Sequence, residues 1–162
     1  MPSILFVCTA NICRSPMAAA LFQQIIDQQA NVAGWRIESA GTWALEGQPA
    51  AEKSRLVMQR RGLDLSQHRS RTVTAEILRS FDLILTMEGS HKEALRVEFS
   101  TDRGKIYLLS EMVGLLYDVP DPIGSDEADF EATANEIGDL LARGFPKILQ
   151  LLAHSQNIQA VT

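Results

Sequence analysis

Near its N-terminus the chain carries Cys8-Thr9-Ala10-Asn11-Ile12-Cys13-Arg14-Ser15 between two segments of different character. The preceding run, Ile4-Leu5-Phe6-Val7, is apolar throughout and is typical of a buried strand. The following run, Ser15-Pro16-Met17-Ala18-Ala19-Ala20-Leu21-Phe22, is typical of a helix with proline in its first turn. A strand, a tight loop and a helix N-terminus form a geometry that binds phosphate through backbone N–H groups. The three segments therefore predict a phosphate-binding loop in an α/β fold.

Strand-like and helical patterns alternate along the rest of the chain. We expect strands at residues 4–7, 35–39, 82–86 and 105–109. We expect helices at residues 16–29, 49–61, 88–99 and 127–154, a short helix that begins at residue 74, and a break or kink near Gly144 and Pro146. This alternation favours a single three-layer α/β domain, in which a parallel sheet is covered by helices on both faces. We expect that domain over residues 1–155 and a short polar C-terminal tail over residues 156–162.

The 162 residues are 46% hydrophobic and carry a formal net charge of -5. Such a chain is long enough for a sizeable core, and its acidic balance argues against non-specific nucleic-acid binding, which needs a basic face. No apolar run has the length of a membrane span, and the N-terminus lacks the features of a signal peptide. We therefore expect a cytoplasmic protein without nucleic-acid or membrane partners, present as a monomer or a weak dimer.

Cys8 and Arg14 are the residues that give the loop its chemistry. A cysteine at a strand end is usually a small buried hydrophobe, and an arginine near a helix start is usually solvated. The two together are more restrictive, because the positive potential of such a loop favours the thiolate, which is the nucleophilic form. The backbone N–H groups of the loop and the planar fork of Arg14 would hold the phosphoryl oxygens. The expected phosphate-binding residues are Thr9, Ala10, Asn11, Ile12, Cys13, Arg14 and Ser15.

Cleavage of a phosphate monoester also needs an acid that protonates the leaving atom. Asp121 is the candidate, because a proline on each side, in Val119-Pro120-Asp121-Pro122, restricts its loop. An aspartate before proline is also common in turns without any catalytic role, and Asp118 is the alternative acid. The carboxyl ends of parallel strands share one edge of the sheet, so the loop that follows the fourth expected strand can reach Cys8.

Residues around the nucleophile could support the loop. Ser15 could donate a hydrogen bond to the Cys8 sulfur, cap the helix, or do both. Asn11 tolerates a left-handed backbone and is interpreted as shaping the loop. His68 lies in a polar stretch, where it is either solvated or hydrogen-bonded to the loop. Cys13 is either a buried thiol or the partner of Cys8 in an oxidised pair that protects the nucleophile.

The tryptophans and the other histidines are weaker candidates. Trp43 lies in the expected loop 40–48, where it is either a wall of the substrate pocket or a core residue, whereas Trp35 is expected to pack from the second strand. His91 and His154 lie on expected helices and are interpreted as solvated. Histidines and cysteines are too few and too poorly spaced for a zinc site, and the loop lacks the lysine of a Walker motif. We therefore expect no metal and no cofactor.

These residues resemble the low-molecular-weight protein phosphatases over nearly the whole chain. The phosphate-binding signature is Val7-Cys8-Thr9-Ala10-Asn11-Ile12-Cys13-Arg14-Ser15-Pro16-Met17-Ala18. Other matching segments are Ser39-Ala40-Gly41-Thr42, Leu65-Ser66-Gln67-His68-Arg69-Ser70, Phe81-Asp82-Leu83-Ile84-Leu85 and Asp121-Pro122. The resemblance implies a four-stranded parallel sheet and a cysteinyl-phosphate intermediate on Cys8, with Arg14 as oxyanion clamp and Asp121 as acid and then base. It also implies phosphorylated protein substrates, inorganic phosphate as product and no metal.

The family that this chain resembles includes protein-tyrosine phosphatases, protein-arginine phosphatases and arsenate reductases. Ile12 is similar to the tyrosine-specific pattern, whereas the arginine-specific branch has threonine there, so phosphotyrosine is the expected substrate. The protein-arginine phosphatase branch stays the alternative, because three segments of this chain resemble it. They are Met87-Glu88-Gly89-Ser90-His91-Lys92, Glu111-Met112-Val113-Gly114 and Asp121-Pro122-Ile123-Gly124-Ser125. Ile123 stands where many tyrosine phosphatases have an aromatic residue. The expected pocket residues are Ile12, Trp43 and Ile123.

Two further alternatives are an arsenate reductase and a redox-sensing or phosphate-binding module without turnover. Thiol-linked arsenate reduction needs additional cysteines that relay a disulfide, and none follows Cys13. A module without turnover would typically lack the clamp or the acid. Arg14 and Asp121 are both present, which favours an enzyme.

Overall fold

The computed structural model of the chain describes residues 1–30 and 34–161. The apolar run forms strand β1 (Ser3–Cys8), in which every residue is buried, and helix α1 (Arg14–Asp27) follows directly after the loop 9–13. Pro16 lies in the first turn of α1, where backbone N–H groups have no intrahelical partner, so the missing N–H costs no hydrogen bond. The predicted order of strand, loop and helix is confirmed.

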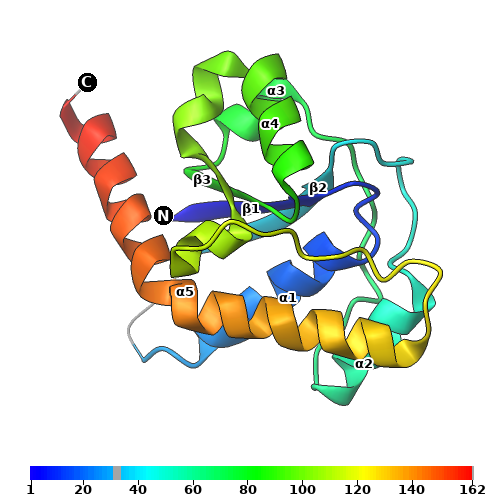
Figure 1. The fold of residues 1–162 in the computed structure, drawn as a ribbon. Helices are drawn as coiled ribbons and strands as arrows, with labels where there is room; N and C mark the ends of the chain where they lie inside the picture. Colours follow the sequence, from blue (N-terminus) through cyan, green and yellow to red (C-terminus); the bar gives the residue numbers. More distant parts are fainter. Residues whose placement is uncertain (31–33, 162) are drawn as a thin grey trace.

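The sheet is parallel and has β1 in its interior. The other strands are β2 (Arg36–Gly41), β3 (Leu83–Thr86) and β4 (Ile106–Leu108). The strand order is β2-β1-β3-β4, so β1 pairs with β2 on one side and with β3 on the other. Because the strands are parallel, their carboxyl ends meet at one edge, which lies where β1 turns back into α1 on the right of Figure 1. The predicted four-stranded parallel sheet is confirmed.

Helices cover both faces of this sheet (Figure 1). Besides α1 they are α2 (Glu52–Arg60), α3 (Ala75–Arg79), α4 (Gly89–Glu98) and α5 (Glu127–Val161), with the 3₁₀ helices η1 (Ser100–Lys105) and η2 (Leu109–Val113) on either side of β4. The expected strand 105–109 is shorter than predicted, because Lys105 and Leu109 belong to these 3₁₀ helices. The expected helix 49–61 begins only at Glu52, since Ala51 is still extended, with ψ 141°.

Alternate side chains of β1 enter two separate cores, which is why both faces need helices. Ile4 and Phe6 belong to the core that α1 and α5 cover, where Phe6 meets Phe22 edge-to-face at 5.7 Å between ring centroids. Leu5 and Val7 belong to the smaller core under α3 and α4. The three-layer α/β architecture is therefore confirmed.

Helix α5 bends without breaking. Figure 1 shows its axis changing direction in the orange segment, where Gly144 and Pro146 lie, and the helix continues to Val161. Pro146 lacks an N–H for the carbonyl of Ala142 and its ring crowds that carbonyl, which accounts for the bend. The predicted kink is present. Most of the segment 156–162, predicted as a polar tail, continues the helix, and Thr162 lies outside the described residues.

Gly144 is expected to resist substitution, although alanine normally stabilises a helix interior. A Cβ at Gly144 would lie 2.6 Å from the Cβ of Met112 in η2, so α5 and η2 would have to separate. We expect Gly144→Ala to lower the free energy of unfolding by about 1–3 kcal/mol. At Gly138, in the same helix, no described neighbour lies within 4 Å of the place that a Cβ would take. Gly138→Ala is therefore the matched control and should add up to about 1 kcal/mol.

Urea unfolding of both variants measures this difference. Stabilisation by Gly144→Ala would contradict the close approach of α5 to η2.

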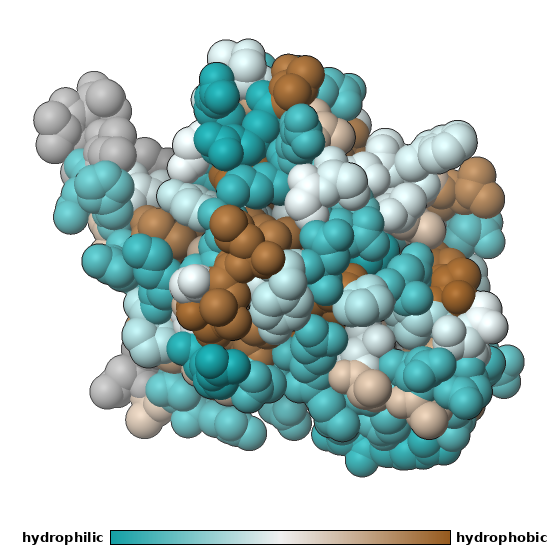
Figure 2. Space-filling model, viewed as in Figure 1, coloured by the Kyte–Doolittle hydropathy of each residue, from teal (hydrophilic) through white to brown (hydrophobic). Residues whose placement is uncertain are grey.

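The face of the molecule that is turned to the viewer in Figure 1 carries both polar and apolar side chains (Figure 2). Figure 2 shows several apolar patches, and the broadest lies over the segment that follows η2, where Leu115 and Leu116 are 49% and 77% exposed. Across residues 1–30 and 34–161, no helix combines the length and the hydropathy needed to cross a bilayer.

Candidate active site

The loop that is predicted to bind phosphate lies at the carboxyl edge of the sheet, between the last residue of β1 and the first residue of α1. Cys8 ends β1 and is 3% exposed, and its Sγ atom lies 3.0 Å from Ser15 Oγ. Thr42 and Trp43, which follow β2, donate their N–H groups to the carbonyls of Cys8 and Thr9. Gly41 allows this approach, because a side chain there would collide with the carbonyl of Thr9. The end of β2 thus supports the start of the loop.

Asn11 turns the loop through a left-handed backbone, with φ 58°. Its side chain is fully buried, and both of its polar atoms are hydrogen-bonded. Nδ2 donates to Ser15 Oγ at 2.8 Å and to Ser39 Oγ at 3.0 Å, and Oδ1 accepts from Arg71 N at 3.0 Å. An asparagine is one of the few residues that can both adopt this backbone and bridge these groups. The geometry is that expected of a residue that shapes the loop.

Ser15 is oriented by the same network. Because Asn11 donates to Ser15 Oγ, the hydroxyl proton of Ser15 is free to point at Cys8 Sγ, which is closer, at 3.0 Å, than the alternative acceptor Ala40 O, at 3.4 Å. The buried hydroxyl can therefore donate to a thiolate on Cys8.

His68 contacts the loop from the segment that follows α2. Its Nε2 lies 2.6 Å from the carbonyl oxygen of Asn11. A carbonyl can only accept, so Nε2 carries the proton and donates it. Burial lowers the pKa of His68, so the ring is neutral near neutral pH. Of the two interpretations of His68, the contact with the loop is present and the solvated one is wrong.

Arg14 begins α1 and is only 1% exposed. Its Nη1 donates to Glu88 Oε1 at 2.6 Å and to the carbonyl of Val119 at 2.8 Å, and its Nη2 lies 3.5 Å from Asp121 Oδ2. Burial tends to raise the pKa of Glu88, but the hydrogen bond and the charge of Arg14 outweigh burial and lower it. Glu88 is therefore ionised and fixes the direction of the guanidinium.

The two candidate acids point to different places. Asp121 lies beside Arg14, its side chain is 42% exposed, and its Oδ1 accepts from Ile123 N at 3.0 Å within the turn. Asp118 accepts from Gly89 N at 2.8 Å, at the start of α4. Of the two carboxylates, Asp121 is the one placed at the loop.

A small hollow joins the predicted site residues. Its lining consists of Cys8, Ala10, Asn11, Ile12, Cys13, Arg14, Asp121 and Ile123. Trp43 does not line it. Its side chain is 84% exposed, so the interpretation of Trp43 as a core residue is wrong. Trp35 instead packs against the core, edge-to-face with Phe22, just before β2 begins.

Cys13 differs from Cys8 although both are free and buried thiols. Burial, the largest effect, raises the pKa of Cys13 to about 12. The Cys13 side chain is therefore a neutral thiol near neutral pH, whereas Cys8 has the Ser15 hydroxyl 3.0 Å from its sulfur.

Sequence reasoning missed two residues of the site, Glu88 and His91. His91, interpreted as solvated, is 5% exposed, and its Nε2 lies 2.8 Å from Thr9 Oγ1. That interpretation is wrong, whereas His154 is exposed as expected. The signal that could have found them is their position, because Glu88 and His91 follow β3 and β3 ends at the same edge of the sheet as β1.

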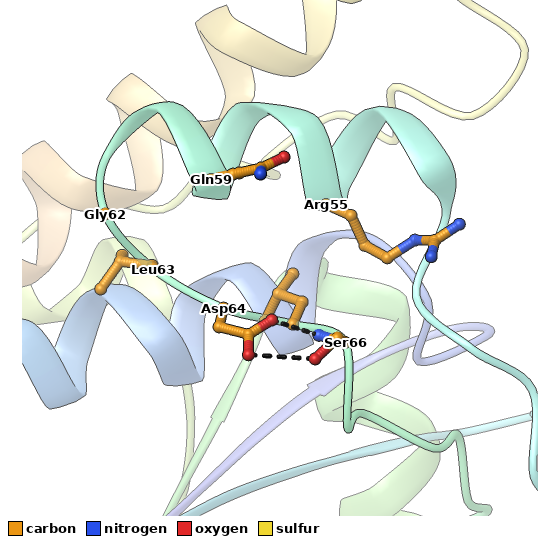
Figure 3. Close-up of a pocket in the computed structure, with 7 residues that line it drawn as sticks. Arg55, Gln59, Gly62, Leu63, Asp64 and Ser66 are labelled. Carbon is orange, nitrogen blue, oxygen red and sulfur yellow. Dashed lines mark hydrogen bonds between the residues drawn. The ribbon is translucent and has the colours of Figure 1, made fainter.

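A larger hollow lies elsewhere, beneath α2, and Figure 3 shows its lining. Its residues are Arg55, Gln59, Gly62, Leu63, Asp64, Leu65 and Ser66. The one carboxylate among them, on Asp64, accepts from Ser66 N at 2.8 Å and from Ser66 Oγ at 3.0 Å, so it closes a turn (Figure 3). This lining offers neither a thiol nor a histidine for chemistry. Within residues 1–30 and 34–161, no group of three or more histidine, cysteine, aspartate or glutamate side chains is arranged to hold a metal ion.

Known proteins share this combination of sequence and geometry. The sequence profile described as "Low molecular weight phosphotyrosine protein phosphatase" matches residues 3–154. The chain is 36% identical over 142 residues to a probable low molecular weight protein-tyrosine-phosphatase EpsP of Ralstonia nicotianae, a match that covers 88% of this chain and 90% of the relative. It is also 36% identical over 140 residues to a protein-arginine-phosphatase of Bacillus subtilis, which covers 85% of this chain and 91% of the relative.

A solved structure agrees over the same extent. The low molecular weight protein tyrosine phosphatase of T. tengcongensis superimposes with a TM-score of 0.85 at 36% identity, over 91% of this chain and 99% of that chain. The predicted phosphatase is thereby confirmed at the level of the family. The strand, loop and helix around Cys8 and these full-length matches lead to one conclusion: the chain belongs to the low molecular weight phosphotyrosine protein phosphatase family and is a phosphatase.

Proposed function

We propose that the protein removes phosphate from phosphotyrosine in protein substrates through a cysteinyl-phosphate intermediate on Cys8. One observation carries the proposal. The buried Arg14 is aimed by Glu88 at the hollow that Cys8 and Asp121 also line, so a nucleophile, an oxyanion clamp and an acid converge on a single point. Phosphate-monoester hydrolysis through cysteine needs these three groups.

In the first step the Cys8 thiolate attacks phosphorus. The bond from phosphorus to the tyrosine oxygen breaks, and Asp121 transfers its proton to that oxygen. The products are a free tyrosine side chain and a phosphoryl group on the Cys8 sulfur. The fork of Arg14 and the loop N–H groups of Thr9, Ala10, Asn11, Ile12, Cys13, Arg14 and Ser15 hold the three non-bridging oxygens, whose charge persists in the transition state.

In the second step water attacks the phosphoryl group. Asp121, now a carboxylate, accepts a proton from this water as its oxygen bonds to phosphorus. The sulfur–phosphorus bond breaks and the electron pair returns to Cys8, where the Ser15 hydroxyl at 3.0 Å donates to the departing thiolate. Inorganic phosphate leaves, and the thiolate of Cys8 and the acid form of Asp121 are restored without any cofactor.

The substrate side chain would be held by apolar residues at the rim of the hollow. Ile12 and Ile123 line the hollow, and Ile123 is 49% exposed. The exposed Trp43, in the loop that supports Thr9, is available as a wall for the phosphotyrosine ring. Branched and aromatic side chains suit the flat face of an aromatic ring.

Phosphoarginine is the second candidate substrate. The relative from Bacillus subtilis is named a protein-arginine-phosphatase, and Ile123 supplies no aromatic ring after Asp121 and Pro122. Asp121, as the acid that protonates the leaving atom, could serve a guanidinium nitrogen as well as a phenol oxygen. Ile12 favours phosphotyrosine, because its apolar side chain offers no hydrogen bond to the N–H groups of an arginine substrate.

A side-by-side assay of two peptides tests the proposal. The wild-type protein, in reducing buffer without added metal, should hydrolyse a phosphotyrosine peptide with a kcat/KM at least about tenfold higher than for the matched phosphoarginine peptide. Ile12→Thr should narrow or reverse this preference, and Ile12→Val, which stays apolar and branched, is the matched control that should keep it. The rate of Cys8→Ser, which lacks the proposed nucleophile, is the background that is subtracted for each peptide.

A wild-type preference for phosphoarginine would replace the proposed substrate by the alternative. Hydrolysis of neither peptide above the Cys8→Ser background would reject the proposed function itself.

We further propose a cytoplasmic location, action as a monomer or a weak dimer, and no nucleic-acid or membrane partner. The location is supported by chemistry, because a thiolate nucleophile with a second thiol in the same loop needs a reducing compartment.

Cys13 is then the group that could form a disulfide with Cys8 under oxidation and protect the Cys8 sulfur from over-oxidation.

A further inference from the structure

The first turn of α4 contacts both ends of the phosphate-binding loop. At the start of the loop, Thr9 Oγ1 lies 2.8 Å from His91 Nε2. At the end of the loop, Arg14 Nη1 donates to Glu88 Oε1 at 2.6 Å. Glu88 directly precedes α4 and His91 lies in the first turn of α4. The start of one helix therefore contacts both ends of the loop.

The direction of the hydrogen bond between His91 and Thr9 follows from the other ring nitrogen. Glu88 N donates to His91 Nδ1 at 3.2 Å, so Nδ1 is an acceptor and carries no proton. Burial lowers the pKa of His91, and the charge of Arg14 acts in the same direction, whereas the carboxylates of Glu88, Asp118 and Asp121 oppose it. The ring is therefore neutral near neutral pH, and its single proton lies on Nε2, which donates to Thr9 Oγ1.

Thr9 is held from two sides as a result. Its carbonyl accepts from Trp43 N at 3.0 Å, and its hydroxyl accepts from His91 at 2.8 Å. These contacts fix the main chain immediately after Cys8, where the first N–H groups of the cradle lie. The second half of the loop has its own support, from Asn11 and His68.

We propose that His91 is a positioning residue for phosphate binding: its Nε2–H donates to Thr9 Oγ1 and holds the first part of the loop in the shape that receives the phosphoryl oxygens. The proposal rests on the proposed function, since the loop shape matters only if this loop binds phosphate. His91 does not line the hollow that Cys8 and Asp121 share, so it acts through Thr9.

Two substitutions separate the two hydrogen bonds of the ring. In His91→Asn the side-chain oxygen can still accept from Glu88 N, but the side chain is too short to reach Thr9. In His91→Gln the side-chain nitrogen can reach Thr9 Oγ1. We expect His91→Asn to raise the inhibition constant of inorganic phosphate and to lower kcat/KM for an aryl phosphate, both by about fivefold. A change of this size corresponds to the loss of one hydrogen bond between neutral groups. We expect His91→Gln to restore most of both losses.

A role in folding alone predicts a different pattern, in which the unfolding temperature falls and phosphate inhibition keeps its wild-type value. Thr9→Val removes the hydroxyl with little change of shape, so His91→Asn should have no further effect on phosphate inhibition in a Thr9→Val background. His154→Asn, at the exposed histidine of α5, is the matched control that should leave both readouts unchanged. Full additivity of His91→Asn and Thr9→Val, or wild-type phosphate inhibition in His91→Asn, would overturn the proposal.

Binding measurements separate this proposal from the proposed function. ¹⁵N NMR of the histidine rings should show His91 protonated at Nε2 and not at Nδ1, and calorimetric titration with inorganic phosphate needs no turnover. If the wild type binds phosphate and hydrolyses no substrate, the proposed function fails, and the loss of phosphate affinity in His91→Asn still tests the role of His91. Protonation at Nδ1 would exclude the proposed donor and overturn the role.

Discussion

Replacement of Cys8 by serine is expected to lower kcat by at least about 10⁴-fold on every substrate. A serine hydroxyl is a far weaker nucleophile than a thiolate. The first step needs Asp121 in its acid form, so Asp121 is not available as a base to deprotonate the serine hydroxyl. The cradle itself should persist, because Asn11 and Arg14 keep their partners. Inorganic phosphate should therefore still bind to Cys8→Ser while turnover disappears. Stopped assays with calorimetric phosphate titration measure both quantities.

Cys13→Ser is the matched control, since it makes the same chemical change in the same loop. Cys13 is a neutral thiol whose burial raises its pKa to about 12, so its replacement removes no nucleophile and should cost far less activity than Cys8→Ser. Equal losses in the two variants, or near-normal turnover by Cys8→Ser, would show that the nucleophile is not Cys8.

Replacement of Asp121 by alanine is expected to slow a phosphotyrosine peptide by about 10²–10⁴-fold. A tyrosine oxygen leaves poorly unless it is protonated, whereas an aryl phosphate with a strongly electron-withdrawing leaving group needs little help. The loss on such an aryl phosphate should therefore be much smaller in the first step. A pre-steady-state burst measures that step separately from hydrolysis of the phosphoenzyme, in which Asp121 acts as base.

Asp118→Asn is the control for this experiment. Asp118 accepts from Gly89 N at the start of α4, and an asparagine oxygen can accept the same bond, so peptide turnover should change little. Equal losses by Asp121→Ala on both substrates would indicate a structural role for Asp121. A large, leaving-group-dependent loss in Asp118→Asn would move the acid to that residue.

The local part of the site could be predicted from the sequence because it is one continuous segment. Residues 4–22 contain the strand, the loop and the helix start, and the pattern of apolar residues, Pro16 and the paired Cys8 and Arg14 is sufficient to place them. Asp121 could be predicted as well, since parallel strands bring their following loops to one edge.

The same rule places Glu88 and His91, which follow β3, at this edge of the sheet, but it does not predict that their side chains contact Arg14 and Thr9. Glu88 and His91 are polar residues near a helix start, which is their ordinary place on a surface. Their burial depends on how α4 packs against β3 and on how far the loop after β1 extends, and both are tertiary properties. The 84% exposure of Trp43 is likewise a tertiary property, because the sequence pattern of loop 40–48 fits a buried and an exposed tryptophan equally. The ends of β4 could not be predicted either, because the 3₁₀ helices η1 and η2 include Lys105 and Leu109.

The separation in sequence between Arg14 and Val119 has a consequence for synthesis. The guanidinium is anchored on a carbonyl 105 residues further along the chain, and its other partner, Glu88, lies 74 residues away. A nascent chain contains the loop sequence early, but the ribosome must release residues as far as Val119 before the guanidinium of Arg14 can meet both partners. Arg14 therefore acquires these partners late in synthesis, although it lies close to the N-terminus.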